Sequence, residues 1–196
     1  MNIRITHNSA LIIIDVQKDF CPGGALPVPE GDKVVPVLNR YIKKFSDKGL
    51  PIYYTRDWHP GNHVSFKSQG GIWPPHCVQD TKGAEFHDDL LIPHEAVIIS
   101  KGTLPDKEAY SGFQGTDLAD ELKKKDVRKV FTGGLATDYC VKSTILDAIK
   151  DGFEIVFIAD GSRWVEVKPG DSERAIGEML SKGAIRVTFE DIYSRD

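Results

Sequence analysis

Six short apolar segments recur along the chain, and within each of them the apolar residues run almost continuously instead of alternating with polar ones. Continuous segments rich in Ile, Val and Phe are typical of parallel strands that are covered on both faces of a sheet. We therefore predict strands at residues 9–16, 51–57, 95–100, 128–134, 154–160 and 184–189.

Four segments between these strands carry apolar residues at helical spacing, near residues 31–48, 115–125, 138–151 and 171–182. Gly49 follows the first as a C-terminal cap, and the third ends at Gly152. Thr137 or Asp138 is expected to cap the start of the third. The alternation of strands and helices predicts a three-layer α/β fold with a mostly parallel six-stranded sheet and right-handed crossovers.

Residues 58–94 interrupt this alternation with 37 residues that include four prolines, two tryptophans and five histidines. A loop of this length inside a compact domain is usually either functional or disordered, and the aromatic residues argue against disorder. We therefore predict a functional insertion. The sequence contains no repeat, low-complexity tract or obvious linker, so residues 1–196 are expected to form a single domain.

Charge and composition exclude several classes of function. The formal net charge is −4 and the basic run in "LKKKD" is typical of a solvated helix face, so nucleic acid is not expected as a partner. The apolar run "ALIIIDV" is too short to span a bilayer, and the N-terminus does not resemble a signal peptide. Three scattered cysteines do not form a disulfide framework, so we expect a cytoplasmic, reduced protein.

Polar side chains follow the predicted strands at one edge of the sheet. In an open parallel sheet, sites form outside the carboxyl ends of the strands. The residues at or after these ends are Asp15, Asp57, Lys101, Asp160 and, beyond Gly134, Cys140. Their convergence predicts a site along this edge.

Cys140 opens a predicted helix within "TGGLATDYCV". A buried cysteine is most often inert packing, but a helix N-terminus favours the thiolate. Taken alone, Asp15 could be a turn or capping carboxylate and Lys101 a surface residue. Taken together, the cation would stabilise a thiolate while the carboxylate takes and returns a proton, which fits hydrolysis of an amide through a thioester.

A second group of candidate residues begins at the end of the second strand. Asp57 and His59 are two residues apart, so in an extended chain their side chains project to the same side. His76 would complete an Asp/His/His set, which suits Zn²⁺, Fe²⁺ or Mn²⁺. His63 could be a fourth ligand or a partner of a ligand, or have neither role. Cys77 is expected to point away from the metal, because neighbours in an extended chain face opposite sides.

Six motifs resemble the nicotinamidase (pyrazinamidase) branch of the isochorismatase-like cysteine hydrolases: "LIIIDVQKDFCPGGAL", "RDWHPGNHVSF", "WPPHCVQDTKGAEF", "SKGT", "YSGF" and "GGLATDYCVKST". They stand in the family order and span roughly residues 10–165. The resemblance implies a Rossmann-like sheet and a catalytic triad of Asp15, Lys101 and Cys140. It also implies one divalent metal ion, with Zn²⁺ ahead of Fe²⁺ and Mn²⁺, held by Asp57, His59 and His76.

The resemblance further implies a substrate and its pocket. Nicotinamide, and with it pyrazinamide, would be hydrolysed to the acid and ammonia, a reaction of NAD salvage. The metal would hold the ring nitrogen and place the amide carbon over Cys140. Phe20, Trp73 and Tyr110 match the aromatic positions that line the family's pyridine pocket.

The turn before the cysteine carries two more family features. The oxyanion hole would be formed by the backbone N–H groups of Ala136 and Cys140. A cis peptide bond without proline, here Leu135–Ala136, shapes this turn in the family. Tyr139 departs from family patterns that carry a histidine at this position.

Several other functions stay open at this point. Amidohydrolases of the superfamily that act on carbamoyl or small aliphatic amides share the triad, but they are not expected to need a metal. A vinyl-ether hydrolase like isochorismatase gives Cys140 no clear role, and a haloacid-dehalogenase-type phosphatase needs a second Asp where this chain reads "DVQ". A non-catalytic metal-binding module would not require the triad. The sequence leaves open the physiological metal, a homo-oligomeric state and the preference among amides.

Overall fold

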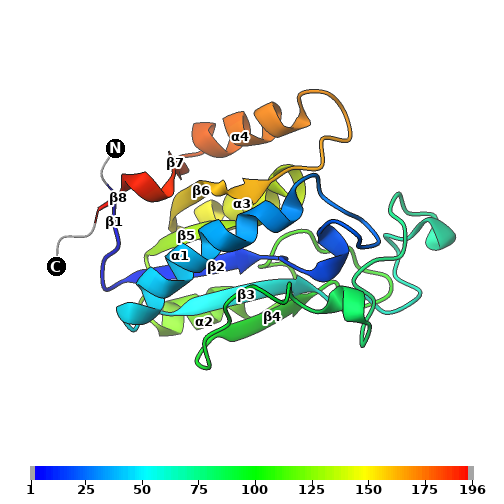
Figure 1. Cartoon of the computed structure of the whole chain (residues 1–196), viewed down its shortest axis with the longest axis horizontal. Helices are drawn as coiled ribbons and strands as arrows, with labels where there is room; N and C mark the ends of the chain where they lie inside the picture. The colour runs from blue at the N-terminus through cyan, green and yellow to red at the C-terminus, as the bar shows by residue number, and fades with distance from the viewer. Residues whose placement is uncertain (1–2, 194–196) are drawn as a thin grey trace.

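The structure, a computed structural model, describes residues 3–193. A six-stranded sheet in the order β4-β3-β2-β5-β6-β7 forms its centre (Figure 1). The strands are β2 (Ser9–Ile14), β3 (Ile52–Asp57), β4 (Val97–Lys101), β5 (Lys129–Leu135), β6 (Glu154–Arg163) and β7 (Ile185–Val187). All five neighbouring pairs are parallel, so the predicted sheet and its six strands are confirmed.

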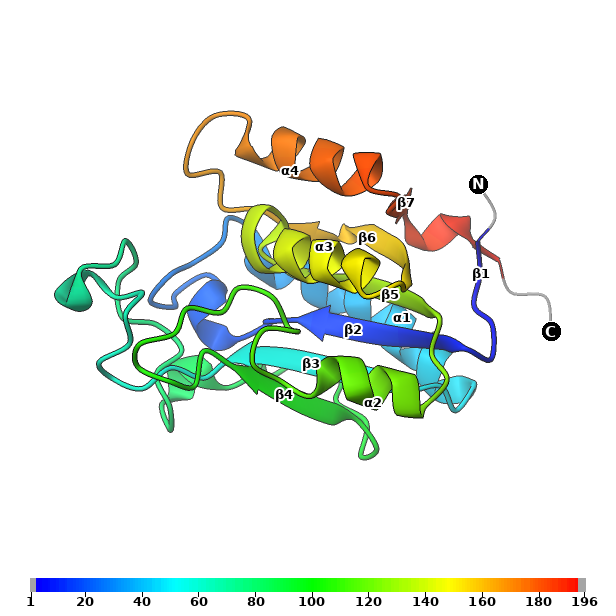
Figure 2. The same ribbon diagram turned by 180° about the vertical axis from the view of Figure 1, so that it is seen from behind.

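Helices cover both faces of this sheet (Figures 1 and 2). They are α1 (Val34–Asp47), α2 (Leu118–Lys124), α3 (Lys142–Lys150) and α4 (Asp171–Ser181), and α3 follows directly on a π-helical turn, η5 (Thr137–Val141). All four predicted helices are present. Gly49 and Gly152 follow α1 and α3 with φ of 62° and 90°, the left-handed conformation of a C-terminal glycine.

The continuous apolar pattern of the strands is explained by two separate cores. Leu11 and Ile13 of β2 join the cluster that α1 covers, whereas Ile12 and Ile14 join the cluster that α2, α3 and α4 cover. Successive side chains of a strand point to opposite faces, so a strand that is buried on both faces must be apolar at every position.

The predicted N-terminal cap of the third helix is wrong. The Thr137 hydroxyl donates to the carbonyl of Arg163 at 3.1 Å. The Asp138 carboxylate accepts the backbone N–H groups of Val165 and Glu166 at 3.0 and 2.9 Å. Both side chains therefore fasten the chain that follows β6 and do not cap their own helix.

The insertion of residues 58–94 contains only short 3-10 turns, η3 (Lys67–Gln69) and η4 (Lys82–Ala84). It leaves the sheet at the carboxyl end of β3 and extends beyond that edge of the sheet (Figures 1 and 2). The edge at which the sites of parallel sheets form is thus the edge that the insertion covers.

Smaller elements were not anticipated from the sequence. A second, two-stranded sheet pairs β1 (Ile3–Arg4) with β8 (Ile192–Tyr193) in parallel. Further 3-10 turns are η1 (Lys18–Phe20), η2 (Gly31–Lys33) and η6 (Phe189–Asp191). Within residues 3–193, no helix is both long and apolar enough to cross a bilayer.

Candidate active site

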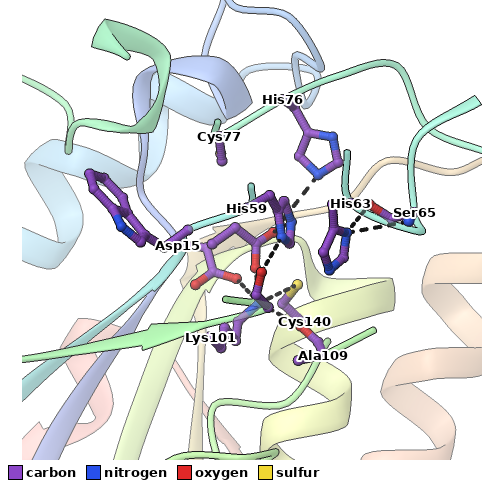
Figure 3. A network of polar contacts seen from close by, with 12 residues as sticks. Asp15, His59, His63, Ser65, His76, Cys77, Lys101, Ala109 and Cys140 are labelled. Atoms are coloured by element: carbon purple, nitrogen blue, oxygen red, sulfur yellow. Dashed lines mark hydrogen bonds and ion pairs between the residues drawn. The ribbon is translucent and has the colours of Figure 1, made fainter. Parts of the chain in front are cut away.

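Four candidate side chains from four different strand ends meet in one buried group. Figure 3 labels three of them, Asp15, Lys101 and Cys140. Asp15 directly follows β2, Asp57 ends β3, Lys101 ends β4, and Cys140 lies in η5 just after β5. Each is at most 6% exposed. Parallel register brings these ends together; Asp57, for example, pairs directly with Lys101.

Asp160, which was expected on the same edge, does not join this group. β6 continues past it to Arg163, so Asp160 is not at a strand end. Its carboxylate lies 3.4 Å from the hydroxyl of Tyr41 and accepts the N–H of Phe189 at 3.0 Å, so it links β6 to α1 and η6.

The ammonium of Lys101 is the centre of the buried group. It lies 2.9 Å from Asp15 Oδ2 and 3.4 Å from the sulfur of Cys140, contacts Asp57 Oδ1, and donates to the carbonyl of Ala109 at 3.1 Å. Burial alone would lower the pKa of Lys101, but the two carboxylates raise it well above its ordinary value. Lys101 is therefore a permanent cation beside the thiol.

Asp15 has one oxygen fixed and one oxygen available. Oδ1 accepts the Thr55 hydroxyl at 2.6 Å, whereas Oδ2 has no hydrogen-bond partner within the described part of the chain, although the Lys101 ammonium contacts it. Burial raises the pKa of Asp15, against the lowering effect of Lys101. A buried carboxylate with a raised pKa holds a proton more readily than an exposed one, as a general base for a thiol must.

Burial also determines whether the side chain of Cys140 is a thiol or a thiolate before the reaction. It raises the pKa of the thiol well above its ordinary value; Lys101 opposes this shift, and Asp15 and Asp57 add to it. The thiolate expected from the helix start alone is therefore outweighed by burial. Cys140 is a thiol whose proton has to be removed, and Asp15 and Asp57 each have a carboxylate oxygen within 4.8 Å of its sulfur. Of these two carboxylates only Asp15 has a raised pKa, so Asp15 is the one suited to take the proton.

The second group places three donor atoms around one point. The ligand atoms of Asp57, His59 and His76 lie within 4.8 Å of one another, with Asp57 Oδ2 at 3.4 Å from Nε2 of His59 and 3.9 Å from Nε2 of His76. Nδ1 of His59 bonds the carbonyl of Gly102 at 2.9 Å, and Nδ1 of His76 bonds the carbonyl of Pro74 at 2.7 Å. Because a carbonyl only accepts, each neutral ring carries its hydrogen on Nδ1 and turns the Nε2 lone pair toward Asp57. This donor set fits a divalent metal ion.

Gly102 makes one of these bonds geometrically possible. Its φ is 60°, and a side chain at this position would overlap the ring of His59. The residue directly after Lys101 therefore positions a ligand of the metal group.

Asp57 belongs to both groups. Its Oδ1 contacts Lys101 while its Oδ2 faces the two histidines. Burial alone would raise the pKa of Asp57, but the positive charge of Lys101 holds it well below its ordinary value, so the carboxylate stays ionised.

Gln17 is a residue of the site that the sequence did not reveal. It is fully buried; its Oε1 accepts the N–H of Asp57 at 2.8 Å, and its Nε2 donates to the carbonyls of Asp57 and Ala84 at 2.8 and 2.9 Å. These partners lie 40 and 67 residues away, so no local pattern could have indicated them. Gln17 fixes the backbone of Asp57 against the far end of the insertion.

A single pocket opens on both groups and is lined by Cys140, Asp57 and His76 together. The three predicted aromatic residues, Phe20, Trp73 and Tyr110, line it as well. The other lining residues are Leu26, Val28, Ala136, Tyr139 and Val165.

Tyr139 completes an aromatic wall. Its ring lies 5.1 Å from that of Trp73 and 5.6 Å from that of Tyr110, and Trp73 Nε1–H donates to the Tyr110 hydroxyl at 2.9 Å. Phe20 lies 5.5 Å from the ring of His76. The position at which the chain departs from the family pattern is thus part of the pocket itself.

The turn that precedes Cys140 contains the expected cis peptide bond, Leu135–Ala136. The carbonyl of Ala136 accepts the N–H groups of Tyr139 and Val141, both at 3.1 Å. Cys77 is not part of the metal-donor set, and its N–H donates to Asp19 at 2.7 Å.

Comparisons with known proteins agree with this geometry. The model of the isochorismatase domain matches residues 9–191. A nicotinamidase from Escherichia coli K12 is 41% identical over 203 residues, covering 93% of this chain and 95% of that protein. The crystal structure of a pyrazinamidase of Pyrococcus horikoshii in complex with zinc is 56% identical with a TM-score of 0.89, covering 93% and 99% of the two chains. PnC1 from L. infantum in complex with nicotinate is 32% identical over both whole chains, with a TM-score of 0.92.

Proposed function

The chain belongs to the isochorismatase family, and we propose that it is a nicotinamidase, an amidohydrolase that converts nicotinamide to nicotinic acid and ammonia. One observation carries the proposal: a single aromatic pocket reaches both the thiol of Cys140 and the metal donors Asp57 and His76. A substrate with a reactive amide at one end and a metal-binding atom at the other satisfies both groups at once. Pyrazinamide has the same two features.

The pocket explains how such a ring would be held. The walls formed by Phe20, Trp73 and Tyr110 suit a flat aromatic substrate. When bound by Asp57, His59 and His76, a divalent ion, which we propose to be zinc, supplies an electrophilic site for the ring nitrogen. Fixing the amide carbon beside a nucleophile in this way can lower the barrier by several kcal/mol, on the order of 7–11 kcal/mol in the best intramolecular cases.

The first half of the reaction forms a thioester. Asp15 Oδ2 takes the proton from the sulfur of Cys140, and the ammonium of Lys101, 3.4 Å from that sulfur, stabilises the thiolate. The thiolate attacks the amide carbon. The negative charge that develops on the amide oxygen is held by the backbone N–H groups of Ala136 and Cys140.

The second half releases both products. Asp15 returns its proton to the departing nitrogen, which leaves as ammonia, and the acyl group stays on Cys140 as a thioester. Asp15 then takes a proton from a water molecule, whose oxygen attacks the thioester carbon. Collapse of this adduct frees nicotinic acid, and the sulfur recovers its proton from Asp15.

The proposal includes a cellular compartment and a pathway. A domain of residues 1–196 would work in the cytoplasm in NAD salvage, on a small molecule alone. Its three cysteines are all unpaired and buried, as a thiol enzyme in a reducing compartment requires.

Ammonia release from nicotinamide by the purified protein, before and after chelation and with zinc restored, tests the proposal. We expect release that stops on chelation and returns with zinc. Ammonia release that continues unchanged after chelation would show that the metal takes no part in the reaction. No release from reduced, zinc-loaded protein would contradict the proposed function and would favour hydrolysis of a carbamoyl or aliphatic amide.

A further inference from the structure

His63 lies against the metal-donor group but is bonded in a different way from the two donor histidines (Figure 3). It is fully buried, and its ring stacks on that of His59 with 4.0 Å between centroids and 24° between planes. Position alone would make it a candidate fourth ligand. Its hydrogen bonds decide otherwise.

Both ring nitrogens of His63 already have partners. Nε2 lies 3.0 Å from the carbonyl of Lys107, and Nδ1 lies 2.7 Å from the hydroxyl of Ser65. Because the carbonyl can only accept, Nε2 must carry a hydrogen, and in the neutral ring the Nδ1 lone pair then accepts from Ser65. His59 and His76 have the opposite tautomer, since their Nδ1 atoms face carbonyls and their Nε2 lone pairs face the donor group at Asp57 Oδ2. His63 has no lone pair left for a metal.

The carbonyl that accepts from His63 is that of Lys107, and it belongs to an exposed segment that joins two parts of the site. Residues 103–108 are exposed and connect Lys101 to Tyr110 of the pocket wall. Two hydrogen bonds join the insertion to this segment. Nε2–H of His63 donates to the carbonyl of Lys107, and the N–H of Val64 donates to the carbonyl of Pro105 at 2.7 Å.

The segment also reaches the reacting groups. The carbonyl of Ala109, two residues after Lys107, accepts the ammonium of Lys101 at 3.1 Å. The next residue, Tyr110, receives the indole N–H of Trp73. A shift at Lys107 would therefore move both an acceptor of the catalytic cation and one side of the pocket.

We propose that His63 is a positioning residue, which fastens residues 102–110 to the insertion and so fixes Ala109 and Tyr110, and that it is not a metal ligand. Only its kinetic consequence rests on the proposed function. Its effects on metal affinity and on the exposed segment do not.

Two substitutions separate the two roles. His63→Phe keeps a flat ring against His59 but removes both nitrogen bonds, whereas His63→Gln keeps an amide donor near the place of Nε2. His76→Phe, at a donor residue, is the control for metal loss, and His94→Phe, at an exposed histidine, is the control for the substitution itself.

Three quantities are measured on each protein: zinc affinity by competition with a chelator, the rate of trypsin cleavage after Lys107, and kcat and KM for nicotinamide. For His63→Phe we expect a zinc Kd within about threefold of the parent, cleavage and KM both raised about fivefold to tenfold, and kcat changed less, as for loss of a hydrogen bond. His63→Gln should recover most of the cleavage resistance and of KM.

The opposite result would overturn the proposal: zinc affinity lost in His63→Phe and His63→Gln as it is in His76→Phe, with cleavage after Lys107 unchanged. If His63→Phe does not fold, His63→Gln alone decides, since a ligand role predicts zinc loss and a positioning role predicts zinc affinity near that of the parent. If the parent protein releases no ammonia, the proposed function fails, and zinc affinity and cleavage still test the role of His63.

Discussion

The thiol half and the metal half of the pocket differ in what holds their side chains. Asp15, Lys101 and Cys140 stand at or just beyond the ends of parallel strands, where the sheet itself fixes the backbone. His59 and His76 lie in an insertion whose regular structure is limited to short turns. Their rings are oriented by single backbone carbonyls of distant or irregular segments.

This difference shows two ways in which a protein can position functional side chains precisely. At a strand end, the hydrogen-bonded register of the sheet places the side chain, so a functional group needs few contacts of its own. In an irregular insertion, hydrogen bonds from supporting residues such as Gln17 and His63 must do what register does elsewhere. Asp57 joins the halves, with one carboxylate oxygen on each side.

The largest effect should come from the nucleophile. Cys140→Ala removes the only sulfur in the pocket lining given by the described residues, so we expect turnover to fall by about 10⁴-fold or more. Nicotinamide binding to the zinc-loaded protein should persist, because the metal half is intact. Ammonia release and calorimetric binding measure the two effects. Cys21→Ala, at a buried thiol outside the pocket, is the control, and turnover retained by Cys140→Ala would exclude the thioester.

Removal of the cation should affect folding as well as chemistry. Lys101→Met leaves the buried carboxylates of Asp15 and Asp57 without their shared partner, so we expect a loss of about 3–5 kcal/mol in the free energy of unfolding. Urea unfolding of the metal-free protein measures this change, with Lys107→Met at an exposed lysine as control. A loss below about 1 kcal/mol would show that the ammonium is not the centre of the buried group.

Removal of a metal-donor side chain should weaken metal binding and leave the thiol half unaffected. His76→Ala should weaken zinc binding by about 100-fold or more, beyond the 10–100-fold typical for supporting residues. The rate at which a small thiol reagent modifies Cys140 in the metal-free protein should change little. Chelator competition and thiol labelling test this separation, with His94→Ala as control. Unchanged zinc affinity would mean that the metal is bound elsewhere.

The smallest effect should come from the support of Asp57. Gln17→Glu can still accept the N–H of Asp57 but cannot donate to the two carbonyls, so we expect zinc affinity to fall by about tenfold. Gln69→Glu makes the same chemical change at an exposed position of the insertion and should leave zinc affinity unchanged. Equal affinities in both variants would show that the backbone of Asp57 needs no such clamp.

The sequence predicted the parts of the site that depend on topology. Apolar runs placed the strands, and the ends of those strands placed Asp15, Asp57 and Lys101. The same reasoning placed Asp160 wrongly, because β6 continues past it, and such an extension depends on neighbouring strands and not on local pattern. Capping residues are common at helix starts, and this favours Asp138 as a cap, whereas in the structure its carboxylate binds the chain after β6.

The supporting contacts could not be predicted, for a related reason. Gln17 and the carbonyl of Gly102 act across 40 or more residues, and backbone carbonyls have no sequence signature at all. The tautomer of His63 depends on Lys107, which it meets only in the folded chain. Spacing therefore left His63 open between ligand and partner.

In the proposed reaction one substrate bridges the two halves, with its ring nitrogen on the metal and its amide on Cys140. The most direct test compares kcat/KM for nicotinamide and for benzamide, which has the same amide but no ring nitrogen, in the zinc-loaded protein and in His76→Ala. We expect kcat/KM to be about 100-fold higher for nicotinamide than for benzamide, and we expect this advantage largely to disappear in His76→Ala. Equal kcat/KM values for the two amides in the zinc-loaded protein would contradict the proposed reaction.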